Sequence, residues 1–389
     1  MIFLEWNKRS IFTILFWLGG YCTYAQSFQI PVPLDHFNPN SRKITIGYSV
    51  SESFDFSKKT ILVLNDPIDE YLGLNEIIQD VNEGDFNLIR VQGRFFSKDL
   101  EDFLDSHNQT WNQKYLWLNH DQIIRDIETI RHEILGKEEV ILVGFGSSAS
   151  ILFHYLNSFP DKVEKVIALN PLLLDVQENL SFWNLFESLS KNYSSDSEKR
   201  LNFAIHSSRP YFFYTKNERD SLFRVDFESY NVNGLSQSRE AFVDGARVRA
   251  LELIPPDYTN GKSPLVESLG ELAEPLIQSI SEKKFSKSGI RYDEGLKFDG
   301  EVVIIGALNN LFIDPKTFDA IGEFYPDSQI FLLRDGYSLF ETRLSNLVPE
   351  IINVFSGDNT EDKVDLILEL KKDSLLYQGK NYNNIVISK

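Results

Sequence analysis

Two short runs of uninterrupted apolar residues, 140–143 and 302–305, constrain the fold of this chain more than any other feature. A strand that is buried on both faces has this pattern, because helices cover both sides of a parallel sheet. Other β-rich runs alternate with helical patterns along the chain. The predicted strands are residues 43–50, 60–64, 87–91, 139–143, 165–169, 301–305 and 329–333. We therefore predict an α/β fold with a mostly parallel, twisted sheet and helices on both faces.

An amphipathic helix is predicted between the third and fourth of these strands. Ile123, Ile127, Ile130 and Ile134 follow one another at spacings of four, three and four, which places them on one face of a helix. Gly136 follows two residues after Ile134 and is the residue type that most often ends a helix. The helix should pack its isoleucine face against the sheet.

The first 25 residues have the pattern of a secretory signal peptide. Lys8 and Arg9 precede a short apolar run at 11–18, and small or neutral residues follow up to Ala25. The run is too short to span a membrane. We predict cleavage between Ala25 and Gln26 and export to the periplasm, the cell surface or the medium. Cys22, the only cysteine, lies in this segment, so the mature chain would contain no disulfide.

Charge excludes several classes of partner. The chain has 57 acidic and 39 basic residues and a formal charge of −18. Nucleic acids and anionic membranes both need a basic surface, so neither is an expected partner. The acidic run at 358–362 resembles a calcium loop, but Lys363 stands where the loop requires glycine. We predict no metal and no cofactor.

The pattern changes in the middle of the chain. Residues 177–297 are rich in Ser, Asn, Glu and aromatic residues and are too long for a connection. We predict a helical cap here, inserted between core segments 26–176 and 298–356, followed by a charged tail at 357–389. Within these parts we expect a helix at 263–281 interrupted at Pro275, a helix at 363–372 and a last strand at 384–388. The cap aromatics are expected to form mainly cap core rather than a pocket: Phe182, Trp183, Phe186, Tyr211, Phe212, Phe213 and Tyr214.

Residues 138–171 contain the most informative pattern for chemistry. A buried strand leads into Gly144, Phe145, Gly146, Ser147 and Ser148, and then into a helix and another strand. This resembles the nucleophile elbow of the α/β-hydrolase superfamily, whose motif is Gly-x-Ser-x-Gly. The flanking small residues of the motif let the helix pack close to the strand. Gly144 and Ser148 match these flanking positions, whereas Gly146 stands at the position of the nucleophile.

The resemblance extends to most of residues 30–175 and 298–356. Residues 32–36 resemble the N-terminal strand of secreted serine aminopeptidases of the proline iminopeptidase and tripeptidyl aminopeptidase type. Residues 126–136 resemble the helix before their elbow. Gly306 with Pro315, and residues 336–341, resemble the two C-terminal loops that hold the catalytic acid and histidine. The resemblance implies an α/β-hydrolase fold with an inserted helical cap.

Each position of the implied triad is replaced. Gly146 offers no oxygen for an acyl-enzyme. The acid falls at Asn309, or at Asn310 with a shift of one residue, and a neutral amide cannot stabilise an imidazolium. The histidine falls at Tyr337, whose phenol is a poor base at neutral pH. The last histidine is His206, so the 183 residues from 207 to 389 contain none.

The loop that would form the oxyanion hole is also altered. The resembled peptidases have a glycine-rich turn after the strand that ends here at Leu64, whereas this chain has Pro67, without an N–H, together with Asp66 and Asp69. Two carboxylates would repel a developing oxyanion. We predict a cleft lined by the following residues: Asn65, Asp66, Phe145, Gly146, Ser147 and Tyr337.

These replacements predict a pseudohydrolase without a Ser-Asp-His triad. We expect it to bind a peptide, a small ligand or a protein partner without catalysis. One alternative is a hydrolase or aminopeptidase-like enzyme with relocated residues, in which Ser147 is the nucleophile and a cap residue such as His206 the base. Another is a structural subunit of an envelope complex. Of the other histidines, His36 should bond locally, His132 should lie on the surface, and His154 lies too far along its helix to reach Ser147.

Overall fold

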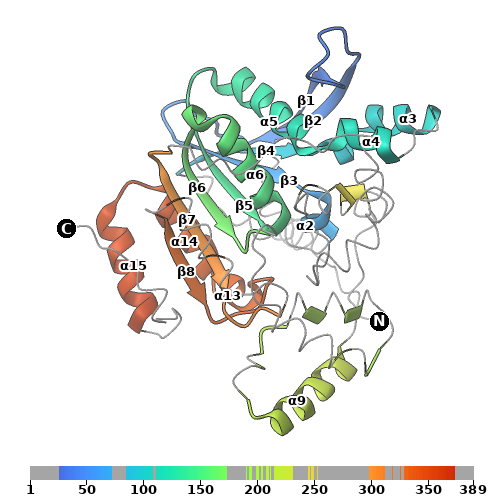
Figure 1. Cartoon of the computed structure of the whole chain (residues 1–389). Helices are drawn as coiled ribbons and strands as arrows, with labels where there is room; N and C mark the ends of the chain where they lie inside the picture. Colours follow the sequence, from blue (N-terminus) through green and yellow to red (C-terminus); the bar gives the residue numbers. More distant parts are fainter. Residues whose placement is uncertain are drawn as a thin grey trace, which may run out of the picture.

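The computed structural model describes residues 26–71, 85–107, 111–172, 298–311 and 328–372, together with 214–230, scattered positions from 190 to 252, and residues 318 and 325. Eight strands form one sheet in the order β1-β2-β4-β3-β5-β6-β7-β8 (Figure 1). The strands are β1 (Gln26–Pro33), β2 (Lys43–Val50), β3 (Thr60–Asn65), β4 (Asn87–Gln92), β5 (Val140–Phe145), β6 (Val163–Leu169), β7 (Glu301–Ala307) and β8 (Gln329–Leu333). The pairs β1–β2 and β2–β4 are antiparallel and the other pairs are parallel. This is an α/β-hydrolase fold, as predicted.

All seven predicted strands are confirmed, with ends that differ by at most two residues. Every residue of β5 is buried, which agrees with the prediction from its continuous apolar run. The strand β1 was not among the strands predicted from apolar runs, and the N-terminal strand that the resemblance placed at 32–36 overlaps it only at residues 32 and 33. It contains Pro31 and Pro33 and lies at the edge of the sheet, where proline is tolerated because one side of the strand needs no ladder hydrogen bonds.

The helices of the core begin and end at recognisable sequence signals. In α5 (His120–Leu135), Asn119 accepts a hydrogen bond from the Gln122 N–H, and Gly136 ends the helix with φ of +63°, as predicted. The helix α6 (Gly146–Ser158) packs on β5 and β6, and α14 (Leu347–Ser356) also contacts β6 (Figure 1). The others are α2 (Pro67–Tyr71), η2 (Arg94–Phe96), α3 (Lys98–Ser106), α4 (Trp111–Leu118), η3 (Pro160–Lys162), α9 (Lys216–Ser229), α13 (Phe340–Leu344) and α15 (Thr360–Lys372).

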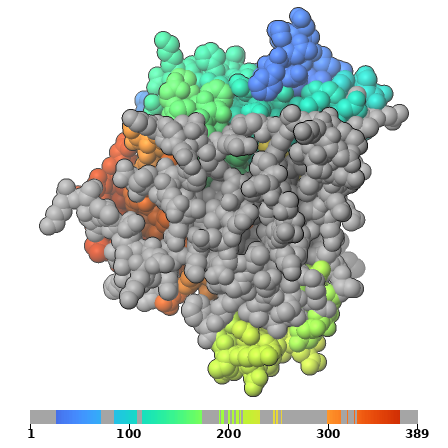
Figure 2. All heavy atoms as spheres, in the orientation of Figure 1, coloured from blue at the N-terminus to red at the C-terminus, as the bar shows by residue number. Residues whose placement is uncertain are grey.

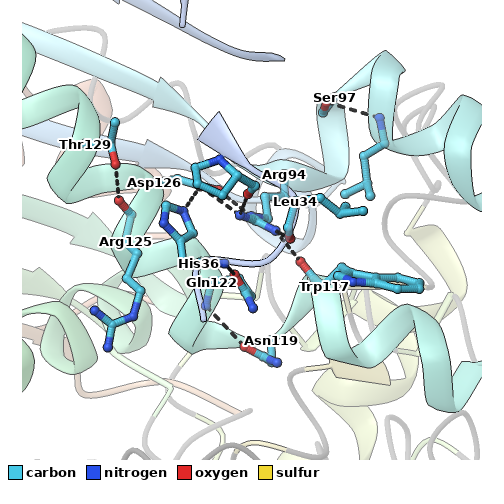
Figure 3. A network of polar contacts seen from close by, with 12 residues as sticks. Leu34, His36, Arg94, Ser97, Trp117, Asn119, Gln122, Arg125, Asp126 and Thr129 are labelled. Carbon is cyan, nitrogen blue, oxygen red and sulfur yellow. Dashed lines mark hydrogen bonds and ion pairs between the residues drawn. The ribbon is translucent and has the colours of Figure 1, made fainter. Parts of the chain in front are cut away.

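A buried arginine ties the first strand to the rest of the core (Figure 3). The guanidinium of Arg94 donates to both carboxylate oxygens of Asp126 on α5, at 2.5 and 3.0 Å. It also donates to the carbonyls of Pro33, Leu34 and Trp117, at 2.8, 2.7 and 2.9 Å. Because these partners come from the end of β1, from α4 and from α5, Arg94 fixes three segments that are far apart in the sequence.

The expectation that His36 bonds only locally was wrong. Its Nε2 lies 2.7 Å from Oδ1 of Asp126, 90 positions along the chain, and its backbone N–H donates to Gln122 (Figure 3). The reason is that β1 runs beside α5, which local sequence does not reveal. His132 is exposed, as predicted.

The described residues between 190 and 252, which lie in the segment predicted as a cap and called the cap segment below, contain an aromatic cluster. The rings of Phe203, Tyr211, Phe223 and Phe227 contact one another with centroid separations of 5.1 to 6.4 Å. The helix α9 lies beyond the ends toward which the arrows of β5 and β6 point, and it forms the lower end of the face in Figure 2. The other cap aromatics apart from Tyr214, the helix at 263–281 and the strand at 384–388 lie outside the described residues.

Among the described residues, no helix is long and apolar enough to cross a membrane. In the same part of the chain, no group of three His, Cys, Asp or Glu side chains is placed to hold a metal ion.

Candidate functional site

The turn from β5 into α6 has the geometry of a strained elbow. β5 ends at Phe145 and α6 begins at Gly146, whose φ is +44°. Glycine reaches this left-handed region without a Cβ penalty. A Cβ on Gly144 would lie 2.8 Å from backbone atoms of Ala149, so the strand and the helix approach too closely for any side chain there. The chain thus makes a sharp turn that aims Gly146 at the surrounding loops.

Tyr337, from the loop after β8, fills the space above Gly146. An ideal Cβ built on Gly146 would lie 2.5 Å from the Tyr337 hydroxyl. The ring of Tyr337 also packs edge-on against Phe145, at 5.4 Å between centroids, and the side chain is 1% exposed. Burial, together with the nearby charges of Asp69 and Asp66, raises the pKa of Tyr337 well above its usual value. The phenol therefore keeps its proton at neutral pH.

Asp69 binds the first turn of α6. Its Oδ1 accepts a hydrogen bond from the Ser147 N–H at 3.1 Å, and its Oδ2 accepts one from the Ser148 N–H at 2.8 Å. Oδ1 would also lie 3.0 Å from a Cβ on Gly146. Burial and the charge of Asp66 raise the pKa of Asp69, although the two N–H donors act in the opposite direction. The sequence predicts only repulsion from Asp69, whereas its carboxyl group accepts hydrogen bonds from both of these N–H groups.

The rest of the loop after β3 is internally bonded as well. Oδ1 of Asp66 accepts a hydrogen bond from the Ile68 N–H at 2.9 Å, as an N-cap does at the start of α2. Nδ2 of Asn65 donates to Glu70 at 3.0 Å. Pro67, which was noted for its missing N–H, occupies the first position of the helix, where no N–H is needed.

The loops after β7 and β8 place Asn309 and Asp335 beside each other. The Asn309 N–H donates to the carbonyl of Asp335 at 3.0 Å, and its side-chain Nδ2 donates to the carbonyl of Ser208 in the cap segment at 2.8 Å. The carboxyl group of Asp335 accepts from Gly336 N–H and from both the N–H and hydroxyl of Thr342. Asn309 therefore serves as an anchor for the cap. Its neighbour Asn310 is fully buried.

Asn170 is a site residue that sequence reasoning missed. It follows β6 with φ of +40°, and its Nδ2 donates to the carbonyl of Tyr337 at 2.6 Å. Its Oδ1 accepts from the Ala307 N–H at 2.8 Å, at the end of β7. Asn170 thus fixes the loop that carries Tyr337. A signal existed, because an Asn-Pro pair directly after an apolar strand marks a specific turn.

Most of the predicted cleft residues meet in the structure, but they are buried. Phe145, Gly146, Ser147 and Tyr337 lie together, and Asp66 is close enough for its charge to influence Tyr337. Ser147 is 0% exposed and Asp66 is 1% exposed, whereas Asn65 is half-buried at the end of β3. In the described part of the chain, the space around Gly146 is filled by the protein's own side chains.

Two buried histidines, His120 on α5 and His154 on α6, contact each other. Nδ1 of His120 lies 3.4 Å from Nδ1 of His154, and both side chains are buried. Glu252, from the cap, accepts hydrogen bonds from the His120 N–H at 3.3 Å and the Tyr115 hydroxyl at 2.9 Å. The prediction that His154 cannot serve Ser147 rests on the helix rise, which separates the two residues by about 10.5 Å. His206 lies outside the described residues.

Comparisons with known proteins give the following matches. No protein-family model matches the chain. Over 100 residues, the chain is 27% identical to ethanol acetyltransferase 1 of Cyberlindnera fabianii, a match that spans 26% of this chain and 28% of that relative.

Similar solved structures include an acetylester hydrolase from Corynebacterium glutamicum, with 12% identity, a TM-score of 0.45 and coverage of 84% of this chain and 93% of that one. They also include a bromoperoxidase from Bacillus anthracis, at 17% identity and a TM-score of 0.45, covering 85% and 100% of the two chains. A homoserine O-acetyltransferase from Staphylococcus aureus matches at 12% identity and a TM-score of 0.46, covering 89% and 100%. At these identities a likeness concerns the fold alone, and by its own strand order and elbow this chain has the α/β-hydrolase fold.

Proposed function

We propose that this chain is an exported α/β-hydrolase-fold protein that has lost the Ser-Asp-His triad and acts by binding a peptide, a small ligand or another protein. It does not perform acyl transfer. The observation that carries the proposal is the filled elbow: Gly146 has no side-chain nucleophile, and the Tyr337 hydroxyl lies where a side chain at 146 would begin. A substrate carbonyl has no room at this point unless Tyr337 moves.

The neighbouring groups support the same conclusion. Asp69 accepts hydrogen bonds from the N–H groups of Ser147 and Ser148, and the N–H after the elbow position, here that of Ser147, is one that an elbow-type enzyme uses to stabilise its oxyanion. Asn309 uses its amide to hold the carbonyl of Ser208. A carboxylate at 309 could not donate this hydrogen bond, so the side chain fits its anchoring role and does not fit the role of a triad acid.

Relocated catalysis through Ser147 is the alternative that needs a direct test. Ser147 is fully buried, and its N–H is bonded to Asp69. The geometry of the elbow argues against this alternative, because the turn aims residue 146, and not residue 147, at the site. Ser147 would also need a base, and the ring of His154 contacts His120 instead.

A fluorophosphonate probe distinguishes these possibilities. The mature protein is treated with the probe, and intact mass is followed by peptide mapping, with heat-denatured protein as the control. We expect no labelling and no hydrolysis of p-nitrophenyl acetate or of aminoacyl arylamides above that control. Stoichiometric labelling at Ser147 or Ser148 would refute the proposal and support a relocated nucleophile.

Binding and structural roles are separated by ligand-dependent melting. The cap segment around Ser208 is fixed to the core by Asn309 and by Glu341, whose carboxyl group accepts a hydrogen bond from the Ser208 hydroxyl at 2.5 Å. A ligand held between cap and core would stabilise these contacts. A screen of peptides and small metabolites in which some compound raises the melting temperature supports binding. If none does, and the protein co-purifies stoichiometrically with an envelope complex, the structural-subunit alternative is correct.

Export is the last part of the proposal. The predicted cleavage site precedes the described part of β1, Gln26–Pro33, whose last carbonyl accepts a hydrogen bond from Arg94. N-terminal sequencing of the exported protein should begin at Gln26. A full-length chain confined to the cytoplasm would contradict this part alone.

A further inference from the structure

Ser207 and Ser208, in the cap segment, lie directly on the loop that follows β8. Gly336 in this loop is buried, and an ideal Cβ built on it would lie 2.7 Å from the carbonyl carbon of Ser207 and 3.0 Å from Cα of Ser208. These are backbone atoms, so no side-chain rotation could make room for the Cβ. Among the described glycines, only Gly136 and Gly146 have positive φ. The close approach of the two backbones, and not an unusual conformation, therefore requires glycine at 336.

Two side chains of the core bind the same segment. The amide of Asn309, after β7, donates to the carbonyl of Ser208 at 2.8 Å, and Glu341 on α13 accepts a hydrogen bond from the Ser208 hydroxyl at 2.5 Å. The two loops of the core are also joined to each other, because the Asn309 N–H donates to the carbonyl of Asp335 at 3.0 Å. We call Ser207 and Ser208 the strap, and the loops after β7 and β8, together with α13, its seat.

The residues on both sides of the strap are bound to α9. Arg209 forms an ion pair with Asp226 on this helix, in which Nε and Nη2 lie 2.5 and 3.2 Å from the two carboxylate oxygens. The Tyr211 hydroxyl donates to the same carboxyl group at 2.6 Å. Before the strap, the ring of Phe203 packs on two aromatic rings of α9, at 5.3 and 5.1 Å between centroids. The strap and α9 therefore belong to one unit, called the α9 unit below.

We propose that the strap locks the α9 unit onto the core, and that the unit opens as one body when the strap leaves its seat. An aromatic cluster and an ion pair hold the unit together, whereas two hydrogen bonds and one close backbone approach hold the strap, so opening should occur at the seat. The seat includes the loops to which the resemblance assigns the catalytic acid and histidine. This inference deepens the proposed function and rests on it, because a ligand bound between the cap segment and the core would enter only while the strap is off its seat.

Distances between two spin labels test the lock. Cys22 is the only cysteine, so after Cys22→Ser the labels can be attached specifically at Val225→Cys on α9 and Leu368→Cys on α15, which are both exposed positions. Gly336→Ala places a Cβ in the space of the strap backbone, so electron–electron resonance should show a second distance population that the parent lacks. Gly357→Ala is the matched control. Its Cβ would make only ordinary contacts, at 3.5 and 3.8 Å, and should leave the distances unchanged.

Hydrogen exchange tests whether the unit moves as one body. In Gly336→Ala the amides of α9 should exchange as slowly as in the parent, because the helix keeps its own contacts when the strap leaves its seat. Asp226→Ala removes the acceptor for Arg209 and Tyr211, so exchange in α9 should become at least tenfold faster. Glu228→Ala, at an exposed position on the same helix, is the matched control and should leave the exchange unchanged.

An unchanged distance distribution in Gly336→Ala would overturn the lock, as would an equal change in the Gly357→Ala control. If exchange in α9 accelerates as much in Gly336→Ala as in Asp226→Ala, the helix unfolds and does not move as one body. If Gly336→Ala does not fold, Ser208→Ala combined with Asn309→Ala replaces it and should give the same second population, because it removes both hydrogen bonds of the strap and adds no atoms. These outcomes do not depend on fluorophosphonate labelling, which tests the proposed function alone.

Discussion

A methyl group added at Gly146 gives a quantitative test of the filled elbow. Gly146→Ala forces a Cβ into the left-handed region, which costs about 1–2 kcal/mol for an L-residue. The new carbon would also lie 2.5 Å from the Tyr337 hydroxyl and 3.0 Å from Asp69 Oδ1, well inside normal contact. Overpacking of this kind costs about 1–3 kcal/mol. We therefore expect a total destabilisation of about 2–5 kcal/mol, measured by urea unfolding.

A double-mutant cycle separates the clash from the strain. Tyr337→Phe removes the atom at 2.5 Å and leaves the ring carbon that bore it 3.6 Å from the new Cβ, which is ordinary contact. Gly146→Ala should then cost about 1–2 kcal/mol less in the Tyr337→Phe background than in the parent. Gly136→Ala is the control for strain alone, because Gly136 also has positive φ and its Cβ would meet no atom within 4 Å.

A coupling energy near zero would contradict the contact between Tyr337 and residue 146. Distant, independent sites add within about 0.3–0.5 kcal/mol, so a coupling below that value means that the Tyr337 hydroxyl does not lie over Gly146. If Gly146→Ala is as stable as the parent, the positive φ and the close contacts described at residue 146 are incorrect. Gly146→Ser meets the same obstacles and should remain without esterase activity, because Tyr337 keeps its proton at neutral pH.

Three further changes test the surrounding contacts. Asn309→Asp should cost about 1–3 kcal/mol in urea unfolding, since a carboxylate that can only accept hydrogen bonds then faces the Ser208 carbonyl. Asn309→Gln keeps the donating amide but moves it along the side chain, so it measures the cost of a displaced donor alone. Arg94→Met removes both hydrogen bonds from the buried guanidinium to Asp126, which keeps the contact to His36, and should cost about 1–3 kcal/mol in urea unfolding. Hydrogen exchange should become faster throughout β1, and unchanged exchange there would contradict the anchoring role. Burial raises the pKa of Asp335, so between the pKa of the unfolded chain and that of the folded chain the unfolded chain binds fewer protons. The free energy of unfolding of the parent, relative to that of Asp335→Asn, should therefore fall as the pH rises through this window. A difference that does not depend on pH would contradict this prediction.

The sequence predicts the sheet well because its strands are defined locally. A run such as 302–305 has no polar residue, and only a strand covered on both faces accommodates it. The missed strand β1 has the opposite character, since Pro31, Pro33 and polar residues at 26, 27 and 29 give no buried run. Its place in the sheet depends on Arg94 and Asp126, two residues that local patterns do not connect.

Part of the candidate site follows from spacing along the chain, and part does not. The turn at Gly146 and the approach of Tyr337 come from the ends of two predicted strands, and parallel strands bring their ends to the same edge of a sheet. The bond from Asp69 to Ser147 links residues 78 positions apart through a short helix. No periodicity marks such a contact, so the sequence identified the charge of Asp69 but not its partner.

The contacts around Gly146 also show why a single substitution to serine does not fit at this position. Any side chain at 146 meets both the Tyr337 hydroxyl and the Asp69 carboxyl group. Moving Asp69 away leaves the N–H groups of Ser147 and Ser148 without acceptors, and moving Tyr337 disturbs the loop that Asn170 fixes. The side chains of Asp69, Asn170 and Tyr337 therefore fit together around glycine at 146 and form one packed unit. A side chain at 146 would therefore need changes at these positions together, each of them destabilising on its own.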